Sequence, residues 1–212
     1  VHCDVLVVGA GISGILAAKN AAKNNLKTLL VDEKNELGGA TIYQNREFNK
    51  IDDQNSSDWL KKEILELKKL KNLEIKTRTS VAAFHGYNYL LARENLTDHL
   101  EKKEKQEKVR QRLLKIRAKK VILATGALER PLVFNNNDRP GIMLSSAVKK
   151  YADFYGVVSG KKNVFFTNND SAYESAFCLH NKGIKVEAII DIRESSNSKI
   201  VKAVKEAGIK IY

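Results

Sequence analysis

Short apolar runs and helical periodicities alternate along the first part of the chain. Residues 4–8 and 28–31 are two apolar, β-branched runs, and each predicts a buried strand. Between them, residues 15–24 place small and apolar side chains at helical spacing. A strand, a helix and a second strand in this order predict a βαβ unit with a parallel sheet.

The middle of the chain adds an amphipathic helix and several short strands. Residues 59–71 place leucine and isoleucine side chains on one helical face. The short strands that follow predict a small antiparallel meander, over residues 73–77, 81–84, 89–92 and 113–117. A further buried strand begins at Val121 and ends in a Thr-Gly pair.

The last third of the chain repeats the strand–helix–strand order. Strands are predicted over 161–167 and 186–190 with a helix over 171–182 between them, and a helix over 198–206 leads to a third strand from Ile209. This repetition predicts a second Rossmann-like unit, which is incomplete within these residues.

The predicted fold class is therefore α/β. We expect a three-layer, Rossmann-like fold, with the second unit inserted into the first. The expected first domain covers residues 1–145 and includes the meander, and the second, truncated domain covers residues 146–212.

The turn after the first strand carries glycines at Gly-x-Gly-x-x-Gly spacing. Gly9 permits the tight turn, Gly11 lets the backbone approach a pyrophosphate, and Gly14 lets the helix pack closely on the strand. The helix N-terminus offers free N–H groups and a positive dipole end to phosphates. We therefore predict a dinucleotide site whose turn comprises Gly9, Ala10, Gly11, Ile12, Ser13 and Gly14.

Two acids, Asp32 and Glu33, follow the second strand at the spacing expected for a ribose contact. We favour Asp32 because it directly follows the apolar run. An acid here disfavours a 2′-phosphate, so NAD is preferred over NADP. FAD uses the same motif, and the sequence leaves NAD and FAD open as the cofactor of this site.

Two further glycine segments extend the predicted cofactor site. The Gly38–Gly39 pair soon after the second strand is typical of two-dinucleotide flavoproteins, although an ordinary loop would also explain it taken alone. The Thr125–Gly126 pair ends the later strand, where the backbone of such proteins lies near the cofactor. Together with the first glycine motif, these segments predict an FAD/NAD(P)-binding fold of the two-dinucleotide flavoprotein type.

The corresponding turn of the second unit departs from the glycine pattern. Thr167 and Asn169 replace the first two glycines, and Ala172 replaces the third. Their side chains would block close approach of a pyrophosphate, and Asp170 adds a negative charge. We therefore do not expect this unit to bind a pyrophosphate.

A net charge of +12 is typical of proteins that bind nucleic acid or an anionic surface. Residues 98–120 carry ten basic against four acidic side chains, which is +6 and half of the total. Acids are interleaved and no aromatic residue is present to stack a base, so a solvated hairpin or helix face is favoured. A basic nucleic-acid-binding module remains the rival that rests on charge alone.

Chemistry-bearing side chains form no catalytic or metal-binding constellation in the sequence. Cys3 and Cys178 lie far apart and predict small buried thiols, as in a reducing cytoplasm. The four histidines show no shared spacing. No apolar run reaches 18 residues, so no transmembrane helix is predicted.

Several stretches resemble the α subunit of heterotetrameric sarcosine oxidase. The resemblance is carried by residues 115–151 and 164–176, and residues 96–100 and 110–113 are similar too. Related modules occur in other amine- or amino-acid-oxidising complexes, such as hydrogen cyanide synthase or a proline dehydrogenase complex. The resemblance covers nearly the whole chain.

This resemblance implies an NAD-holding core within a larger complex. The amine would be oxidised on a flavin in the β subunit, a second flavin would lie between α and β, and FMN and FAD would both be present. The partners would be β, γ and δ subunits, and a tetrahydrofolate-binding domain would follow in α. The chain is then expected to be a cytoplasmic fragment without an N-terminal ferredoxin-like segment and inactive alone.

Two arginines in Pro-containing loops are the remaining candidates for contacts. Arg130 and Arg139 would contact a flavin phosphate or a neighbouring subunit, or else be ordinary loop arginines paired with local acids. An autonomous NAD(P)H-dependent reductase is the alternative enzyme class. It would require glycines in the second turn and a redox cysteine pair, and the sequence has neither.

Overall fold

The N-terminal apolar run forms the central strand of the first sheet. β1 (His2–Val8) leads through the glycine turn into α1 (Ile12–Lys23), which is followed by β2 (Thr28–Val31). This confirms the predicted βαβ unit. The helix begins at Ile12, three residues before the predicted start, because Gly11 acts as its N-cap directly after the turn.

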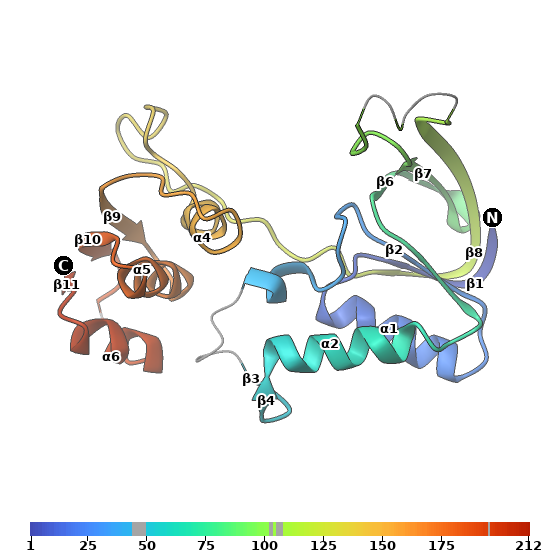
Figure 1. Cartoon of the computed structure of the whole chain (residues 1–212), viewed down its shortest axis with the longest axis horizontal. Helices are drawn as coiled ribbons and strands as arrows, with labels where there is room; N and C mark the ends of the chain where they lie inside the picture. The colour runs from blue at the N-terminus through green and yellow to red at the C-terminus, as the bar shows by residue number, and fades with distance from the viewer. Residues whose placement is uncertain (44–49, 102–103, 105–107, 195) are drawn as a thin grey trace. The chain divides into compact units, whose positions relative to one another are not determined.

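In the computed structural model, residues 1–43, 50–101, 104, 108–194 and 196–212 are described. They form one unit that ends at Ala127 and a second that begins at Leu128 (Figure 1). The sequence placed the division after Ser145. The structure places it earlier because the Glu129 carboxylate accepts hydrogen bonds from the backbone N–H groups of Ser145 and Ser146, which ties this segment to the second unit.

The sheet of unit 1 has six strands in the order β5-β2-β1-β8-β7-β6. β5 (Leu73–Lys76), β2, β1 and the end of β8 (Gln111–Leu123) run parallel. β6 (Thr79–His85), β7 (Tyr89–Asn95) and the start of β8 form the predicted antiparallel meander. We call these last three strands the ribbon.

β8 is one long strand where the sequence predicted two, over 113–117 and from Val121. The buried positions Leu114, Ile116 and Ala118 alternate with exposed residues without a break, so no turn intervenes. At Arg117 the strand is shared, because that residue pairs with Tyr89 of β7 and with His2 of β1. The basic side chains of β8 are exposed, and the solvated-face interpretation of residues 98–120 stays a prediction.

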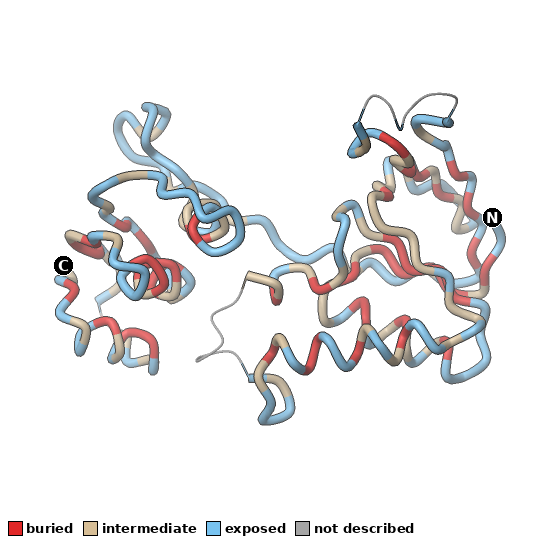
Figure 2. Tube along the Cα trace, viewed as in Figure 1, coloured by how far each residue is buried: buried red, intermediate tan, exposed pale blue. Residues whose placement is uncertain are grey.

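The parallel strands of unit 1 are covered on both faces, which makes three layers. One face packs on α1 and on α2 (Ser56–Leu67), and its core contains Val7, Ile15 and Trp59. The other face packs under the ribbon, and Leu6 and Val31 there meet side chains of β7 and β8. Figure 2 shows the buried residues concentrated along these strands and the helix faces turned toward them.

α2 begins earlier than predicted, and a small hairpin precedes it. The Asn55 side chain accepts a hydrogen bond from the Ser57 N–H, so the helix begins at Ser56 rather than at Trp59. β3 (Lys50–Ile51) and β4 (Gln54–Asn55) form the hairpin, which the sequence did not predict. The described part of the unit also contains the short 3₁₀ segments η1 (Gly39–Tyr43) and η2 (Gly86–Asn88).

Unit 2 has a three-stranded parallel sheet in the order β11-β10-β9. β9 (Lys162–Thr167), α5 (Ser171–Asn181) and β10 (Lys185–Asp191) form its βαβ unit, as predicted. α6 (Lys199–Glu206) and β11 (Lys210–Ile211) follow.

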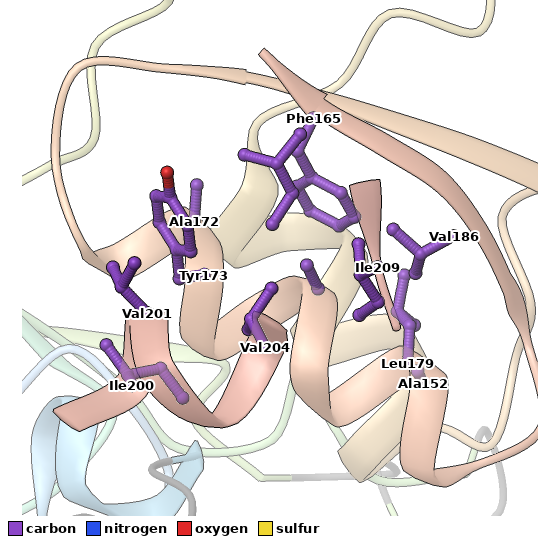
Figure 3. Close-up of a cluster of buried hydrophobic side chains, with 12 residues drawn as sticks. Ala152, Phe165, Ala172, Tyr173, Leu179, Val186, Ile200, Val201, Val204 and Ile209 are labelled. Atoms are coloured by element: carbon purple, nitrogen blue, oxygen red, sulfur yellow. The ribbon is translucent and has the colours of Figure 1, made fainter. Parts of the chain in front are cut away.

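One face of this second sheet packs on α5 and α6. Its core contains Phe165, Tyr173, Leu179, Ile189 and Val204, most of which are drawn in Figure 3. α4 (Ser145–Phe154), a helix that the sequence analysis did not predict, adds Ala152 to this core. Among the described residues, no helix has both the length and the apolar character needed to cross a bilayer.

Candidate functional site

Four sequence-predicted segments of unit 1 meet at one edge of the parallel sheet. The glycine turn (residues 9–14), the Asp32–Glu33 pair and the Thr125–Gly126 pair follow β1, β2 and β8, which run in the same direction. The Gly38–Gly39 pair contacts the same turn. The structure therefore brings together every predicted cofactor-site residue at the carboxyl edge of the sheet, where ligands of open α/β sheets bind.

Backbone packing explains the first and third glycines of the turn. A Cβ atom added at Gly14 would collide with the Gly9 carbonyl oxygen, and one added at Gly9 would collide with the Ala124 carbonyl oxygen. Gly9 also has a φ of +100°, a conformation that side chains disfavour. These two glycines bring α1 and the end of β8 into direct backbone contact with the turn.

Gly11 has a different environment. A Cβ atom added there would have no heavy atom of the described residues within 4 Å, apart from its chain neighbours, and its φ of −72° suits any residue. Within the described part of the chain, no side chain accepts a hydrogen bond from the first turn of α1, and this turn contains no acidic residue. The helix N-terminus therefore faces open space with its backbone N–H groups and positive dipole end available to an anion.

The peptide groups of Ala10 hold three of the four segments together. The Ala10 N–H donates to Asp32 Oδ2 at 2.6 Å, and the Ala10 carbonyl accepts from the Gly38 N–H at 2.7 Å. Asp32 Oδ1 also accepts from the Lys34 N–H at 2.8 Å. The carboxylate that the sequence favoured for the ribose is thus bound to two backbone groups.

Gly39 brings a second backbone segment against the glycine turn. A Cβ atom added at Gly39 would lie 2.9 Å from Gly11 Cα, and its φ is +58°. The neighbouring Gly38 has a φ of +126° and packs against Leu60 of α2. Both glycines are therefore required by local geometry, and this loop covers one side of Gly11.

Glu33 is exposed beside a shallow pocket. Its side chain has no hydrogen-bond partner or ion pair within the described part of the chain. The pocket, of about 450 Å³, is lined by residues from the end of β2 and from the loops that flank β6 and β7: Glu33, Lys34, Asn35, Arg78, Asn95, Asp98 and His99. The last four were not identified from the sequence, because the fold brings them to β2 from 45 to 66 residues away.

The Thr125–Gly126 pair is exposed at the end of β8. The Ala124 N–H donates to the Val8 carbonyl at 2.7 Å, which extends the pairing of β8 with β1 up to the glycine turn. Gly126 has a φ of +74°, and an added Cβ would meet no described atom within 4 Å. The chain thus passes the turn with its backbone open to a bound molecule.

Neither thiol of the chain is poised for thiolate chemistry. Burial raises the pKa of Cys3. Burial, together with the nearby Asp153 carboxylate, raises the pKa of Cys178 to about 12. The described residues contain no cluster of metal-ligating side chains, and all four histidines are exposed.

The two loop arginines lie on the surface of unit 2. Arg130 and Arg139 are exposed, and neither side chain forms an ion pair or hydrogen bond within the described ranges. The described residues therefore give no support to the alternative that these arginines pair with nearby acids. Their contact with a flavin phosphate or a subunit stays a prediction.

Side chains occupy the turn of unit 2. Asn169 Oδ1 accepts from the backbone N–H of Ser171 at 3.0 Å and from its hydroxyl, which satisfies one free donor at the start of α5. The Thr167 hydroxyl is bonded within the same turn. The donors that the first turn leaves open are here partly used by the protein itself.

An ion cluster surrounds Asp191, the acid of unit 2 that corresponds to the acids after β2 in unit 1. Arg193 bridges Asp170 of the turn at 2.7 Å and Asp191 at the end of β10 at 2.7 Å. The Tyr173 hydroxyl donates to Asp191 at 2.8 Å. Burial, followed by this carboxylate, raises the pKa of Tyr173 to about 12.

The sequence predicted that Asp170 adds a negative charge facing any phosphate. The structure instead neutralises it with Arg193. The sequence did not lead us to this role of Arg193. An arginine two residues after the acid that ends a strand could have indicated an ion pair with that acid. In place of an open acid, unit 2 has a carboxylate that its own guanidinium already binds.

Comparison with known proteins gives one family and several relatives. The profile of the family described as pyridine nucleotide-disulphide oxidoreductase matches residues 3–190. A protein of Corynebacterium sp. (strain P-1) named sarcosine oxidase subunit alpha is 41% identical over 211 residues, which is 100% of this chain and 21% of that protein. Its namesake in Rhizobium meliloti (strain 1021) is 37% identical over 195 residues, 92% of this chain and 19% of that protein.

Solved structures include a similar fold in an amino-acid dehydrogenase. L-proline dehydrogenase from P. horikoshii superimposes with a TM-score of 0.70 at 27% identity, over 93% of this chain and 37% of that chain. The present chain spans about a fifth of the length of the curated relatives it matches.

The ion cluster predicts a pH dependence of the stability of unit 2. Hydrogen bonds from Arg193 lower the pKa of Asp191 to about 2 from 3.8. A lowered carboxyl pKa stabilises the folded state above pH 3.8, and this stabilisation is lost as the pH falls through about 2. Asp191→Asn should therefore cost about 2 kcal/mol of unfolding free energy at pH 7 and much less near pH 2.

The measurement is urea unfolding of parent and variant between pH 2 and 7, followed by circular dichroism. Trp59 is the one tryptophan of the chain and lies in the core of unit 1, so its fluorescence reports the other unit. This fluorescence transition should not change with Asp191→Asn. A destabilisation of equal size at pH 2 and pH 7 would contradict a role for the ionised carboxylate.

Proposed function

This chain belongs to the pyridine nucleotide-disulphide oxidoreductase family, and from that premise we propose that unit 1 holds NAD at its glycine turn. The observation that carries the proposal is the open backbone at Gly11, beside an uncapped helix N-terminus at the carboxyl edge of the sheet. The resemblance to sarcosine oxidase α subunits favours NAD. FAD, which carries the same ADP half, is the alternative cofactor.

We assign the two acids after β2 different tasks. Asp32 fixes the glycine turn, because its carboxylate accepts the Ala10 N–H. Glu33 is exposed with no partner of its own in the described chain, so it meets the ribose hydroxyls. The remaining predicted residues surround the pyrophosphate through their backbone: Ala10, Ile12, Ser13, Gly38, Gly39, Thr125 and Gly126.

For the whole polypeptide we propose the α subunit of a sarcosine-oxidising complex in the cytoplasm. The amine would be oxidised on a flavin of a partner subunit, with FMN and FAD in the complex and β, γ and δ subunits as partners. Support comes from 41% identity to a protein named sarcosine oxidase subunit alpha. The two buried, protonated thiols agree with this division of labour, because they give the chain no dithiol chemistry of its own.

A related amine or amino-acid dehydrogenase complex is the second candidate function. The likeness to L-proline dehydrogenase, at a TM-score of 0.70, favours it. Both candidates use unit 1 in the same way and differ in the substrate of the partner. Substrate identity therefore has to be tested on the assembled complex.

The first prediction concerns Gly11. Gly11→Val places a branched side chain where the pyrophosphate would approach, so purified variant protein should retain little or no bound nucleotide. Nucleotide released by heat and identified by mass is the measurement, and it also separates NAD from FAD. Gly86→Val is the matched control, since Gly86 likewise has no described atom near its Cβ position and lies in the turn between β6 and β7. Full nucleotide occupancy in the Gly11→Val variant would show that the nucleotide binds at another site.

The second prediction separates the two acids. Glu33→Ala should weaken nucleotide binding by about 1.5–3 kcal/mol, the scale of a hydrogen bond to a charged group. It should leave the unfolding free energy unchanged because Glu33 is exposed. Asp32→Ala should instead lower the unfolding free energy by about 1–3 kcal/mol, because the buried Ala10 N–H loses its acceptor.

Titration calorimetry and urea unfolding measure these two effects separately. If Asp32→Ala weakens binding at unchanged stability while Glu33→Ala does nothing, the ribose contact belongs to Asp32.

The third prediction is that the chain alone turns over no amine. Sarcosine or L-proline, an electron acceptor and the purified chain should give no reduced acceptor and no formaldehyde, with or without added NAD. The expected reason is that the oxidising flavin belongs to a partner. Appreciable turnover by the chain alone would overturn this proposal and favour an autonomous reductase.

A further inference from the structure

The polar pocket beside Glu33 continues the line of the proposed nucleotide site. In that proposal the pyrophosphate lies at Gly11 and a ribose at Glu33, and the base is bonded to the same ribose. The pocket of about 450 Å³ includes Glu33 in its lining and extends to the loops that flank β6 and β7. A base on a ribose held by Glu33 therefore has this pocket within reach.

Backbone hydrogen bonds hold three sides of the pocket together at Arg78. The Arg78 N–H donates to the Lys34 carbonyl at 2.8 Å, and the Arg78 carbonyl accepts from the Asn95 N–H at 2.9 Å. Arg78 has a φ of +52°, which is uncommon for a residue other than glycine. The ends of β2 and β7 and the start of β6 thus have fixed positions around the pocket.

The loop after β7 is fixed from another direction. The Asp98 carboxylate accepts from Arg110 Nε at 2.6 Å and from Gln111 Nε2 at 2.8 Å, both at the start of β8. The charge of Asp98 is therefore balanced within the protein, and this side of the pocket repels an uncharged aromatic base no more than it repels water.

The side-chain amide of Asn95 lines the pocket without a hydrogen bond. Its Oδ1 atom is buried and has no partner, and Nδ2 likewise has none within the described part of the chain. Native proteins pair nearly all buried polar atoms, because an unpaired one destabilises the fold. Since no bond of this amide has to be broken, the amide is free to turn toward a ligand.

An amide presents a hydrogen-bond acceptor and a donor side by side. Adenine presents the complementary pair, an amino group next to a ring nitrogen, and asparagine is a common bidentate partner of this base. The Arg78 side chain also lines the pocket and has no partner among the described residues. Its planar guanidinium group suits stacking on an aromatic ring.

We infer that Asn95 recognises the adenine base of the bound dinucleotide, with Oδ1 accepting from the amino group and Nδ2 donating to the adjacent ring nitrogen. Arg78 lies against the base in this arrangement. The inference rests on the proposed nucleotide site of unit 1. It holds for NAD and for FAD, because both carry the same ADP half.

The test compares ADP with purine riboside 5′-diphosphate, which lacks only the amino group. Titration calorimetry on nucleotide-free protein gives the two dissociation constants. The parent should bind ADP about two- to tenfold more tightly than the analogue, the range of one neutral hydrogen bond. Asn95→Leu, which is similar in size but apolar, should bind the two nucleotides equally.

Urea unfolding of the nucleotide-free protein separates recognition from a structural role. Asn95→Leu should leave the urea midpoint unchanged or raise it, because an unpaired buried polar atom is replaced by an apolar one. The fluorescence of Trp59 follows this transition in unit 1. A lowered midpoint would show that the amide serves the fold, and would overturn the inference.

Asn35→Leu is the matched control, because Asn35 lines the same pocket and is exposed. This variant should keep the preference of the parent for ADP. Loss of the preference in Asn35→Leu, or its persistence in Asn95→Leu, would overturn the role of Asn95. Equal binding of both nucleotides by the parent would overturn the inference alone, whereas binding of neither would overturn the proposed nucleotide site as well.

Discussion

The site in unit 1 depends on the peptide groups of one buried residue. Ala10 is fully buried, and its N–H and carbonyl are bound by Asp32 and by the Gly38 N–H. A buried peptide group that loses its partner costs about 1–3 kcal/mol. The glycine turn, the end of β2 and the Gly38–Gly39 loop are therefore fixed by one another, and the open backbone at Gly11 is a product of that arrangement.

The sequence predicted those features that are encoded locally. The βαβ units, the meander and the glycine turn follow from periodicity and from spacing within about 30 residues. The rest depends on contacts between distant residues. The first N–H of α4 is bound by Glu129, which lies 16 residues before it. In β8 the many charged residues obscured the alternation of buried and exposed positions. The role of Asp32 depends on its hydrogen bond with the Ala10 N–H, 22 residues away. The cofactor contacts themselves stay predictions.

The two units share a strand–helix–strand arrangement but differ in the turn that precedes the helix. In unit 1, glycines leave the start of α1 uncapped, so its donors remain open. In unit 2, the Asn169 side chain accepts the Ser171 N–H at the start of α5, and Arg193 joins the turn to the acid at the end of β10. Side chains there supply the charge balance that a ligand would otherwise bring. A Rossmann-like unit can in this way keep its fold while its ligand position is filled from within.

The shared strand β8 also constrains how the protein is made. Val8 pairs with Leu123, so the N-terminal strand waits for its neighbour until 115 further residues have been synthesised. At about 5–20 residues per second on the ribosome, that interval is roughly 6–23 seconds. Throughout it, the ribbon face of β1 and β2 stays uncovered on the nascent chain. Non-local pairing of this kind leaves apolar surface exposed to aggregation until the distant strand arrives.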